Sequence, residues 1–127
     1  MPARQLLAIR TMPGADPLRP LVDHPLDPDQ ARSLAIVFKA LADPVRLRLL
    51  SLIASHPNGE ACACELVPAC NVSQPTVSHH LKALRDAGLL TSRRRSPRIQ
   101  FRVVTEALAC LADVLHSGTT WGVGDTA

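Results

Sequence analysis

The chain has 127 residues, enough for one domain with a modest hydrophobic core. Hydrophobic residues make up 46% of it, which excludes a mainly disordered chain, and the 2% of aromatic residues argue against binding single-stranded nucleic acid by base stacking. The net charge is +3, but residues 79–102 carry seven Lys or Arg and one Asp, so this segment has a charge of +6 and the remainder −3. Such a basic segment is typical of a surface that contacts phosphates.

The start of the chain and its thiols predict a compartment. Residues 6–9 are the longest apolar run near the start, which is too short for a secretory signal, and no apolar run is long enough to span a bilayer. We therefore expect a cytoplasmic protein whose four cysteines are reduced. In that compartment thiols bind metals, act in catalysis or are buried more often than they form disulfides.

Periodicity and capping residues predict the first two helices. Residues 1–27 contain five prolines without helical periodicity, which predicts a flexible arm. Apolar residues then recur at i, i+3, i+4 and i+7 from about 29 to 42, as in a helix. Asp43 and Pro44 are a strong start signal for a second helix, because Asp caps the free N–H groups and Pro is tolerated at the first position. This helix should end before the turn cluster at 56–59.

Two further helices follow close together. A third helix is expected over about 64–70, and Pro68 inside it predicts a late start or a distortion, because proline is tolerated only near the first turn. Ser73 should cap a fourth helix that ends at Gly88. Two short helices joined by a tight turn are typical of a helix-turn-helix unit.

The period of the sequence changes after this unit. Residues 99–103 alternate as in a half-buried strand, with 89–93 as the pairing strand, so a hairpin wing is expected. A last helix over about 105–116 carries a wide apolar surface, which predicts a subunit interface against the first helix. The expected fold is mainly α with a β-hairpin wing: a winged helix-turn-helix DNA-binding and dimerisation domain over 28–116, followed by a flexible tail at 117–127.

The fourth helix has the pattern of an element that reads DNA. Val77, Leu81 and Leu84 share one face and should pack into the core, with His80 as a core histidine at its edge. The opposite face is polar and can enter the major groove, its N-terminal turn reaching deepest; His79 is either a contact there or an ordinary surface residue. The candidate DNA-contacting residues are Ser73, Gln74, Thr76, Ser78 and His79 for bases or phosphates, Lys82 and Arg85 for phosphates, and Arg94, Arg95 and Arg98 at the wing tip for a minor groove or backbone.

Two thiols, Cys62 and Cys64, stand directly before the third helix. Thiolates select soft or thiophilic ions, and a helix N-terminus favours the thiolate form. Residues i and i+2 point to the same side only in extended backbone, so one ion held by both thiols needs non-helical backbone there. We expect ion capture to unwind or shift the start of the third helix and so to displace the fourth. The arrangement predicts a switch in which the protein releases DNA when its thiols capture an ion.

Two segments, 38–50 (FKALADPVRLRLL) and 73–81 (SQPTVSHHL), closely resemble the ArsR/SmtB metalloregulators, as does the order of elements over about 29–116. The resemblance implies a homodimeric winged-helix repressor that binds an imperfect inverted repeat of double-stranded DNA and is released by an inducer. The segment 60–66 (EACACEL) is similar to the Cys-x-Cys motif of the family's arsenic, antimony, cadmium and lead sensors. Arsenite or antimonite is therefore the implied inducer, with cadmium or lead as the alternative, and no organic cofactor is implied.

The third ligand of such a site is left open. The family's arsenic sensors often carry a third cysteine three residues after the second, where this chain has Val67. Cys70 is the candidate third metal ligand beside Cys62 and Cys64, but it can join only if the helix breaks at proline; otherwise it is a small buried hydrophobe. Cys110 on the last helix is the alternative, with buried packing as its default, and a cellular thiol or water could also complete the site.

Other functions are compatible with the same residues. In a redox-sensing repressor, Cys62 would be oxidised and would form a disulfide with Cys64 or Cys70. The Cys62–Cys64 pair is the less favoured, because cysteines two positions apart form a strained ring. An enzyme of thiol exchange is disfavoured, because the sequence lacks a Cys-x-x-Cys after a strand and a glycine-rich phosphate loop. A DNA-binding protein with purely structural cysteines would be insensitive to metals.

Overall fold

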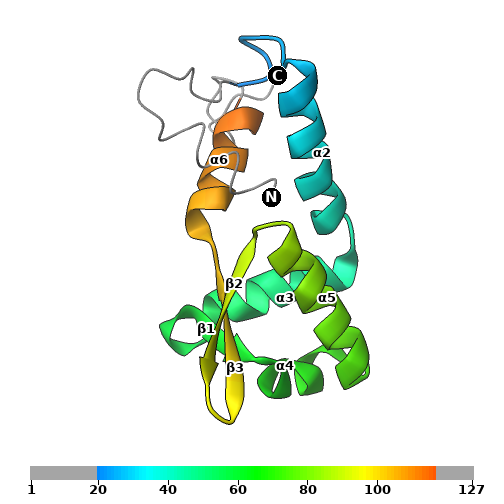
Figure 1. Ribbon diagram of the computed structural model, residues 1–127, viewed down its shortest axis with the longest axis vertical. Helices are drawn as coiled ribbons and strands as arrows, with labels where there is room; N and C mark the ends of the chain where they lie inside the picture. Colours follow the sequence, from blue (N-terminus) through cyan, green and yellow to red (C-terminus); the bar gives the residue numbers. More distant parts are fainter. Residues whose placement is uncertain (1–19, 117–127) are drawn as a thin grey trace, which may run out of the picture.

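The computed structural model of the protein describes residues 20–116. Helices α2 and α6 lie at one end of the molecule, and the other helices and a small sheet form the opposite end (Figure 1). Residues 1–19 of the expected arm and the expected tail 117–127 lie outside the described residues. The elements are α2 (Pro28–Leu41), α3 (Pro44–Ser55), the 3-10 turn η1 (Pro57–Gly59), β1 (Glu60–Cys62), α4 (Ala63–Cys70), α5 (Gln74–Asp86), β2 (Leu90–Arg95), β3 (Arg98–Val103) and α6 (Thr105–Leu115).

The helix starts follow the capping residues. The side chain of Asp43 accepts from the backbone N–H groups of Val45 at 2.8 Å and Arg46 at 3.2 Å, and Pro44 occupies the first turn of α3. Ser73 caps α5 by accepting from the N–H of Thr76. Both predicted helix starts are confirmed, because each depends on hydrogen bonds between residues at most three positions apart.

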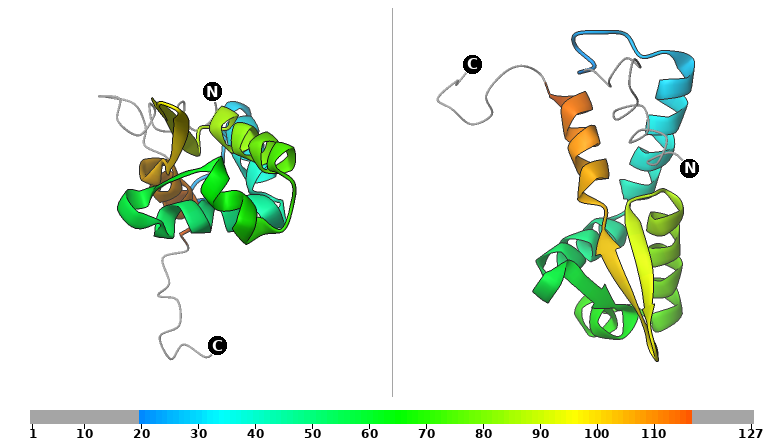
Figure 2. Two further views of the ribbon diagram at one scale, coloured as in Figure 1. Left: turned by 90° about the horizontal axis from the view of Figure 1, so that it is seen from below. Right: turned by 60° about the vertical axis from the view of Figure 1, so that its left-hand side comes forward.

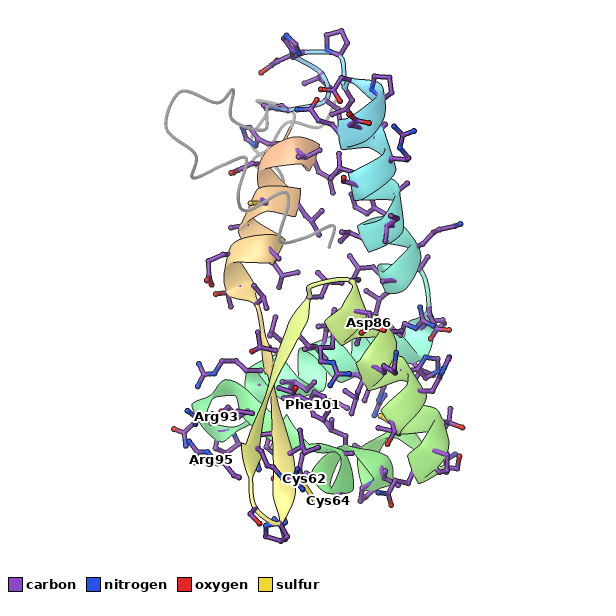
Figure 3. The ribbon with its side chains drawn as sticks, viewed as in Figure 1. Cys62, Cys64, Asp86, Arg93, Arg95 and Phe101 are labelled. Carbon is purple, nitrogen blue, oxygen red and sulfur yellow. A yellow bond between two sulfur atoms is a disulfide. The ribbon has the colours of Figure 1, made fainter. Side chains whose placement is uncertain are left out.

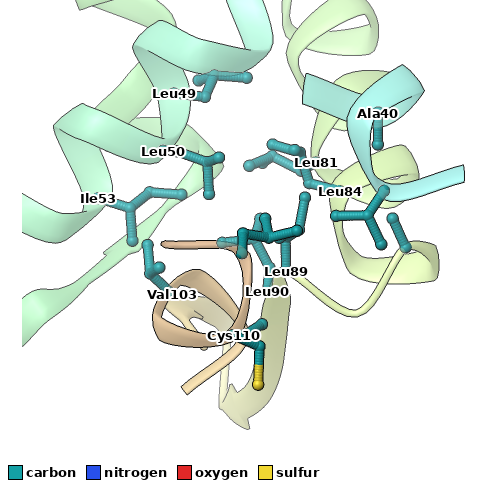
Figure 4. Packing of buried hydrophobic residues seen from close by; sticks show 14 of the residues in the cluster. Ala40, Leu49, Leu50, Ile53, Leu81, Leu84, Leu89, Leu90, Val103 and Cys110 are labelled. Carbon is teal, nitrogen blue, oxygen red and sulfur yellow. The ribbon is translucent and has the colours of Figure 1, made fainter. Parts of the chain in front are cut away.

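One hydrophobic core joins the helix-turn-helix unit to the sheet (Figure 4). The predicted inner face of α5, formed by Val77, Leu81 and Leu84, is fully buried. It packs in one cluster with residues of α3, α4 and the start of the hairpin. Each fully buried leucine or valine contributes about 1.5–3 kcal/mol of hydrophobic stabilisation. The position of α5 is therefore set mainly by its apolar face. The same buried cluster contains Leu49, Ile53, Leu66, Leu89 and Leu90.

The sheet has one strand more than the sequence analysis predicts. The hairpin of β2 and β3 is confirmed, with its turn at Ser96 and Pro97, but β1 pairs antiparallel with β3 and gives the order β1-β3-β2. Strand β1 has only three residues, too short for a period-2 pattern to stand out. Its register places Glu60 opposite Arg102 and Cys62 opposite Gln100, so the thiol segment is hydrogen-bonded to the wing.

Helix α4 corrects the expectation of a late or distorted start. It begins at Ala63 and continues to Cys70 with Pro68 inside. The proline removes one helical hydrogen bond, the one that the carbonyl of Cys64 would accept. Glu65 offsets this loss at the helix start, where its carboxylate accepts the N–H of Cys62 at 3.0 Å.

Helices α2 and α6 both extend away from the rest of the fold, as the right-hand view of Figure 2 shows clearly. Residues 20–27, which belong to the expected arm, form a turn whose Leu21 N–H donates to the carbonyl of Val114 on α6 at 2.9 Å. Ile36 on α2 and Leu108 and Leu115 on α6 are exposed apolar residues. No helix within residues 20–116 is long and apolar enough to cross a membrane.

Candidate DNA interface and thiol site

Helix α5 presents a polar, exposed face beside its buried one. Gln74, Ser78, His79, Lys82 and Arg85 are exposed, as expected for residues that contact DNA. The other two candidates at this helix have structural roles as well. The hydroxyl groups of Ser73 and Thr76 lie 2.8 Å apart in the N-terminal cap, and the side chain of Thr76 is half-buried. The exposed polar side chains of α5 that are free of the cap are therefore those of the other five candidates.

The two cations of α5 each have a nearby partner, one on the same helix and one on β2. Lys82 Nζ lies 2.8 Å from a carboxylate oxygen of Asp86, one turn further on, and this hydrogen bond is the main reason why the pKa of Asp86 is lowered. Arg85 donates to the hydroxyl of Ser92 on β2 at 3.5 Å. Both side chains remain exposed, so each can exchange its partner for a DNA phosphate.

His80 fixes α5 to the start of α3. Arg46 Nε donates to His80 Nδ1 at 3.0 Å. The pKa of Asp43, which caps α3, is lowered first by the backbone N–H of Arg46, with smaller contributions from the N–H of Val45 and the charge of Arg46. His80 was expected to be a core histidine. It is half-buried and links two helices at the edge of the core.

The predicted wing arginines lie on two faces of the sheet. Alternation along β2 places Arg94 on the same face as Ser92, which contacts α5 through Arg85. Arg95 and its cross-strand partner Arg98 lie on the opposite face. Figure 3 shows Arg95 on the β1 side of the hairpin, together with Arg93 and away from α5. One arginine of the wing therefore lies on the face next to α5, and a larger group of arginines lies on the opposite face.

The thiols lie where β1 meets α4. Cys62 is the last residue of β1, has extended backbone (φ −95°, ψ 163°) and is buried, at 2% exposure. Cys64 lies in the first turn of α4 and is exposed. Their sulfur atoms form a disulfide at 2.06 Å (Figure 3).

This geometry corrects two expectations about the thiols. The four cysteines are not all reduced, and a Cys62–Cys64 disulfide is not disfavoured, because extended backbone at Cys62 directs both side chains to one side. The same backbone brings the two sulfurs together while α4 begins at Ala63, and the expected unwinding or shift of this helix on ion capture stays a prediction.

A carboxylate and an imidazole support this junction. Glu65 accepts the backbone N–H of Cys62 through one oxygen and lies 2.9 Å from His56 Nε2 through the other. The Cys62 N–H is the largest cause, and His56 the second, of a lowered pKa at Glu65. The carboxylate therefore stays ionised at neutral pH and holds the backbone that positions the thiols.

Among residues 20–116, the structure does not bring a third protein ligand to the pair. Because α4 is a continuous helix, Cys70 at its C-terminal end is about 9 Å of helical rise from Cys64 and on another face, where it packs half-buried against the core. Cys110 is fully buried on α6, far from solvent in the core cluster (Figure 4). Within residues 20–116, no group of three or more His, Cys, Asp or Glu could hold a metal ion.

Sequence reasoning missed the acidic residues around the thiols. Glu60 contacts the wing arginines, and Glu65 holds the N-terminal cap. Two signals point to them in retrospect: Glu60 is two residues before Cys62, which places both on one face of an extended strand, and Glu65 follows Cys62 at the three-residue spacing of a capping box.

Known proteins share both the sequence and the fold. Residues 43–92 match the family described as "Bacterial regulatory protein, arsR family". The "Arsenic resistance transcriptional regulator ArsR1" of Pseudomonas putida is 37% identical over 119 residues, covering 91% of this chain and 83% of that protein, and the "Arsenical resistance operon repressor" of Staphylococcus xylosus is 39% identical over 77 residues, covering 61% and 71%. The solution structure of a homodimeric winged helix-turn-helix DNA-binding domain from Mycobacterium bovis is 32% identical, with a TM-score of 0.56, and covers 69% of this chain and 82% of that domain. The chain therefore belongs to the arsR family and is a winged helix-turn-helix, DNA-binding transcriptional repressor.

Proposed function

We propose that this repressor releases its operator when arsenite or antimonite is captured by Cys62 and Cys64. The observation that carries the proposal is the meeting of the two sulfur atoms at the junction of β1 and α4, with Cys64 open to solvent. Two thiolates at one point are suited to a thiophilic ion. The proposal agrees with the names of the relatives from Pseudomonas putida and Staphylococcus xylosus, which are regulators of arsenic resistance.

The chemistry begins from the reduced pair, because a disulfide has no thiol to offer. Arsenous acid reacts with two thiols so that two As–S bonds form, two As–O bonds break, and two water molecules leave with the thiol protons. Arsenic keeps its +3 state and retains one hydroxyl. The described residues bring no third protein ligand to the pair. The third coordination position of arsenic is therefore occupied by the remaining hydroxyl or by a small-molecule thiol.

Capture is transmitted to α5 through α4, which packs beside it in the core. Arg48 on α3 donates to the carbonyl of Ala69 near the end of α4 at 3.0 Å, so a shift of α4 is felt by both neighbouring helices. In the DNA-bound state the exposed residues of α5 enter the major groove and the wing arginines contact the backbone. The residues that we assign to DNA are Ser73, Gln74, Thr76, Ser78, His79, Lys82, Arg85, Arg94, Arg95 and Arg98.

The repressor acts as a homodimer through α2 and α6, with 28–116 as its DNA-binding and dimerisation domain. Ile36, Leu108 and Leu115 are exposed on these two helices, and apolar surface of this kind is stabilised by burial in a subunit interface. A twofold dimer places two copies of α5 on half-sites about 34–36 Å apart. This spacing suits an inverted repeat.

Release is tested with the duplex that the reduced protein selects from a randomised library. Fluorescence anisotropy of this duplex is followed while arsenite is added to the wild type, Cys62→Ser and Cys64→Ser, with Cys70→Ser as the matched control. We expect release from the wild type and the control, and retention by the first two variants. Equal release from all four proteins would contradict the assignment, and cadmium, lead and antimonite in the same assay rank the inducers.

The disulfide favours a second candidate function, in which oxidation is the trigger. Peroxide would take two electrons from Cys62 and Cys64, forming the S–S bond and two water molecules. The two candidate functions are distinguished by keeping the protein fully reduced with a phosphine, which contains no thiol. Arsenite releases DNA there if it is the inducer, whereas peroxide releases DNA only after the reductant is removed.

A further inference from the structure

Glu60 on β1 is the common partner of three wing arginines. Its carboxylate oxygens lie 3.5 Å from Arg93, 3.8 Å from Arg95 and 3.9 Å from Arg102. The side chain of Glu60 is only 12% exposed, whereas the arginine side chains are 56–60% exposed. One largely covered carboxylate therefore faces three largely exposed guanidinium groups.

The register of the sheet explains this convergence. Glu60 is opposite Arg102 on β3, which is opposite Thr91 on β2. Arg93 and Arg95 follow Thr91 at two-residue steps, so alternation places all three arginines on the face that carries Glu60. The labelled side chains of Arg93 and Arg95 lie on this side in Figure 3, away from α5.

Charge on this face is unbalanced and exchangeable. Three positive groups share one negative group, and each separation is longer than a close hydrogen-bonded ion pair. Exposed ion pairs of this length are weak and screened by salt, so a DNA phosphate can replace the carboxylate as the partner of an arginine. Glu60 and DNA therefore compete for the same cations.

The carboxylate is also close to the thiols along the chain. Glu60 and Cys62 are the first and last residues of β1, and the two-residue step places them on the same face of the strand. Cys62 is opposite Gln100, which stands between Arg98 and Arg102 on β3. A change of backbone at Cys62 therefore reaches Glu60 through a single intervening residue.

We propose that Glu60 is a positioning residue of the wing: it competes with DNA phosphates for Arg93, Arg95 and Arg102 and so weakens their contacts with the DNA backbone, and β1 links this restraint to the thiol pair. The restraint rests on the DNA-binding activity alone, whereas the link to Cys62 rests on the proposed function. The two parts are separated by the experiment that follows.

The first measurement is the salt dependence of operator binding by reduced, full-length protein carrying Glu60→Gln. Each additional phosphate contact steepens the slope of log K against log salt by about 0.9, which means about 3.5-fold more affinity lost between 50 and 200 mM salt. We expect a steeper slope than in the wild type. The matched control is Asp29→Asn, which removes one negative charge and one arginine ion pair on α2 and should keep the wild-type slope.

A second variant shows whether a changed slope comes from the lost carboxylate or from misfolding. Glu60→Asp keeps the charge but shortens the side chain by one methylene, so the slope should steepen by less than in Glu60→Gln. Combining Glu60→Gln with Arg93→Gln and Arg95→Gln should bring the slope back toward the wild-type value. Slopes for Glu60→Gln and Glu60→Asp that equal those of the wild type and the control would overturn the restraint.

The second measurement adds arsenite to the same proteins. If the link holds, the ratio of affinities without and with arsenite is smaller for Glu60→Gln than for the wild type and Asp29→Asn. An unchanged ratio together with a steeper slope overturns the link and keeps the restraint. Wild-type protein that is not released by arsenite contradicts the proposed function, and with it the link, while the salt slope still decides the restraint.

Discussion

The recognition helix and the wing hold their cations in different ways. Lys82 on α5 pairs with Asp86 one turn away, within a single element. Arg93 and Arg102 on the wing pair with Glu60 on a third strand that ends at a thiol. The charge pattern of α5 is therefore independent of the thiol segment, whereas that of the wing is tied to it. In the proposed switch, a signal from the thiols has a packing route to α5 and an electrostatic route to the wing.

The largest effect is expected where the packing route is broken. Leu81 is fully buried on the inner face of α5, so Leu81→Ala should lower the free energy of unfolding by about 2–5 kcal/mol through lost burial and a cavity. Urea unfolding measures this loss. The adjacent exposed residue provides the control, since Lys82→Ala should stay within about 0.5 kcal/mol of the wild type. A loss below about 1 kcal/mol for Leu81→Ala would show that this face is not held by packing.

The cap of α5 is the next test of that helix. Ser73→Ala removes the acceptor for the N–H of Thr76 and should cost about 1 kcal/mol of stability. Ser73→Asn should restore most of it, because Asn is an equally good capping residue. Thermal unfolding followed by circular dichroism compares the three proteins. Equal midpoints for Ser73→Ala and the wild type would refute the role of this cap.

Phosphate contacts by α5 should act on affinity without changing the response to the inducer. Arg85→Ala should reduce the salt slope of operator binding by about 0.9 for each phosphate contact that is lost. The ratio of affinities without and with arsenite should stay at the wild-type value, because Arg85 contacts Ser92 and not the thiol segment. A changed ratio would mean that α5 is also coupled to the thiols through its charges.

The smallest effect concerns the pH dependence of the thiol junction. The Cys62 N–H and His56 lower the pKa of Glu65, so its folded value lies below its unfolded one. Its contribution to stability is therefore present above the unfolded value of about 4.3 and is lost as the pH falls through the lowered value. Unfolding of the wild type and Glu65→Gln from pH 7 to pH 3 should show a stability difference that shrinks in acid. A difference that is constant with pH would contradict the role of the ionised carboxylate.

Most of the helical framework could be predicted because its signals are local. The caps at Asp43 and Ser73 and the apolar face of α5 each depend on residues a few positions apart. Pro68 misled the prediction for α4, since one missing hydrogen bond does not end a helix whose start is fixed by Glu65. The hairpin was evident from alternation, and the three-residue β1 was not, because its partner is about forty residues away.

The candidate site divides in the same way. Cys62 and Cys64 stand out as a motif, and their spacing correctly indicates that non-helical backbone is needed to bring them together. The separation of Cys70 from the thiol pair depends on the continuity of α4, and the contacts of Glu60 depend on strand register. Neither can be read from a short segment of sequence. Non-local pairing decides which residues surround the thiols.

In the proposed switch, two thiols control DNA release without a third protein ligand. The most direct test is a protein that carries Cys70→Ser and Cys110→Ala, so that only Cys62 and Cys64 remain. Arsenite is titrated into its reduced complex with the selected duplex while fluorescence anisotropy is recorded. We expect full release with one arsenite per protomer, as in the wild type. Retention of DNA by this protein, while the wild type is released, would contradict the proposed switch.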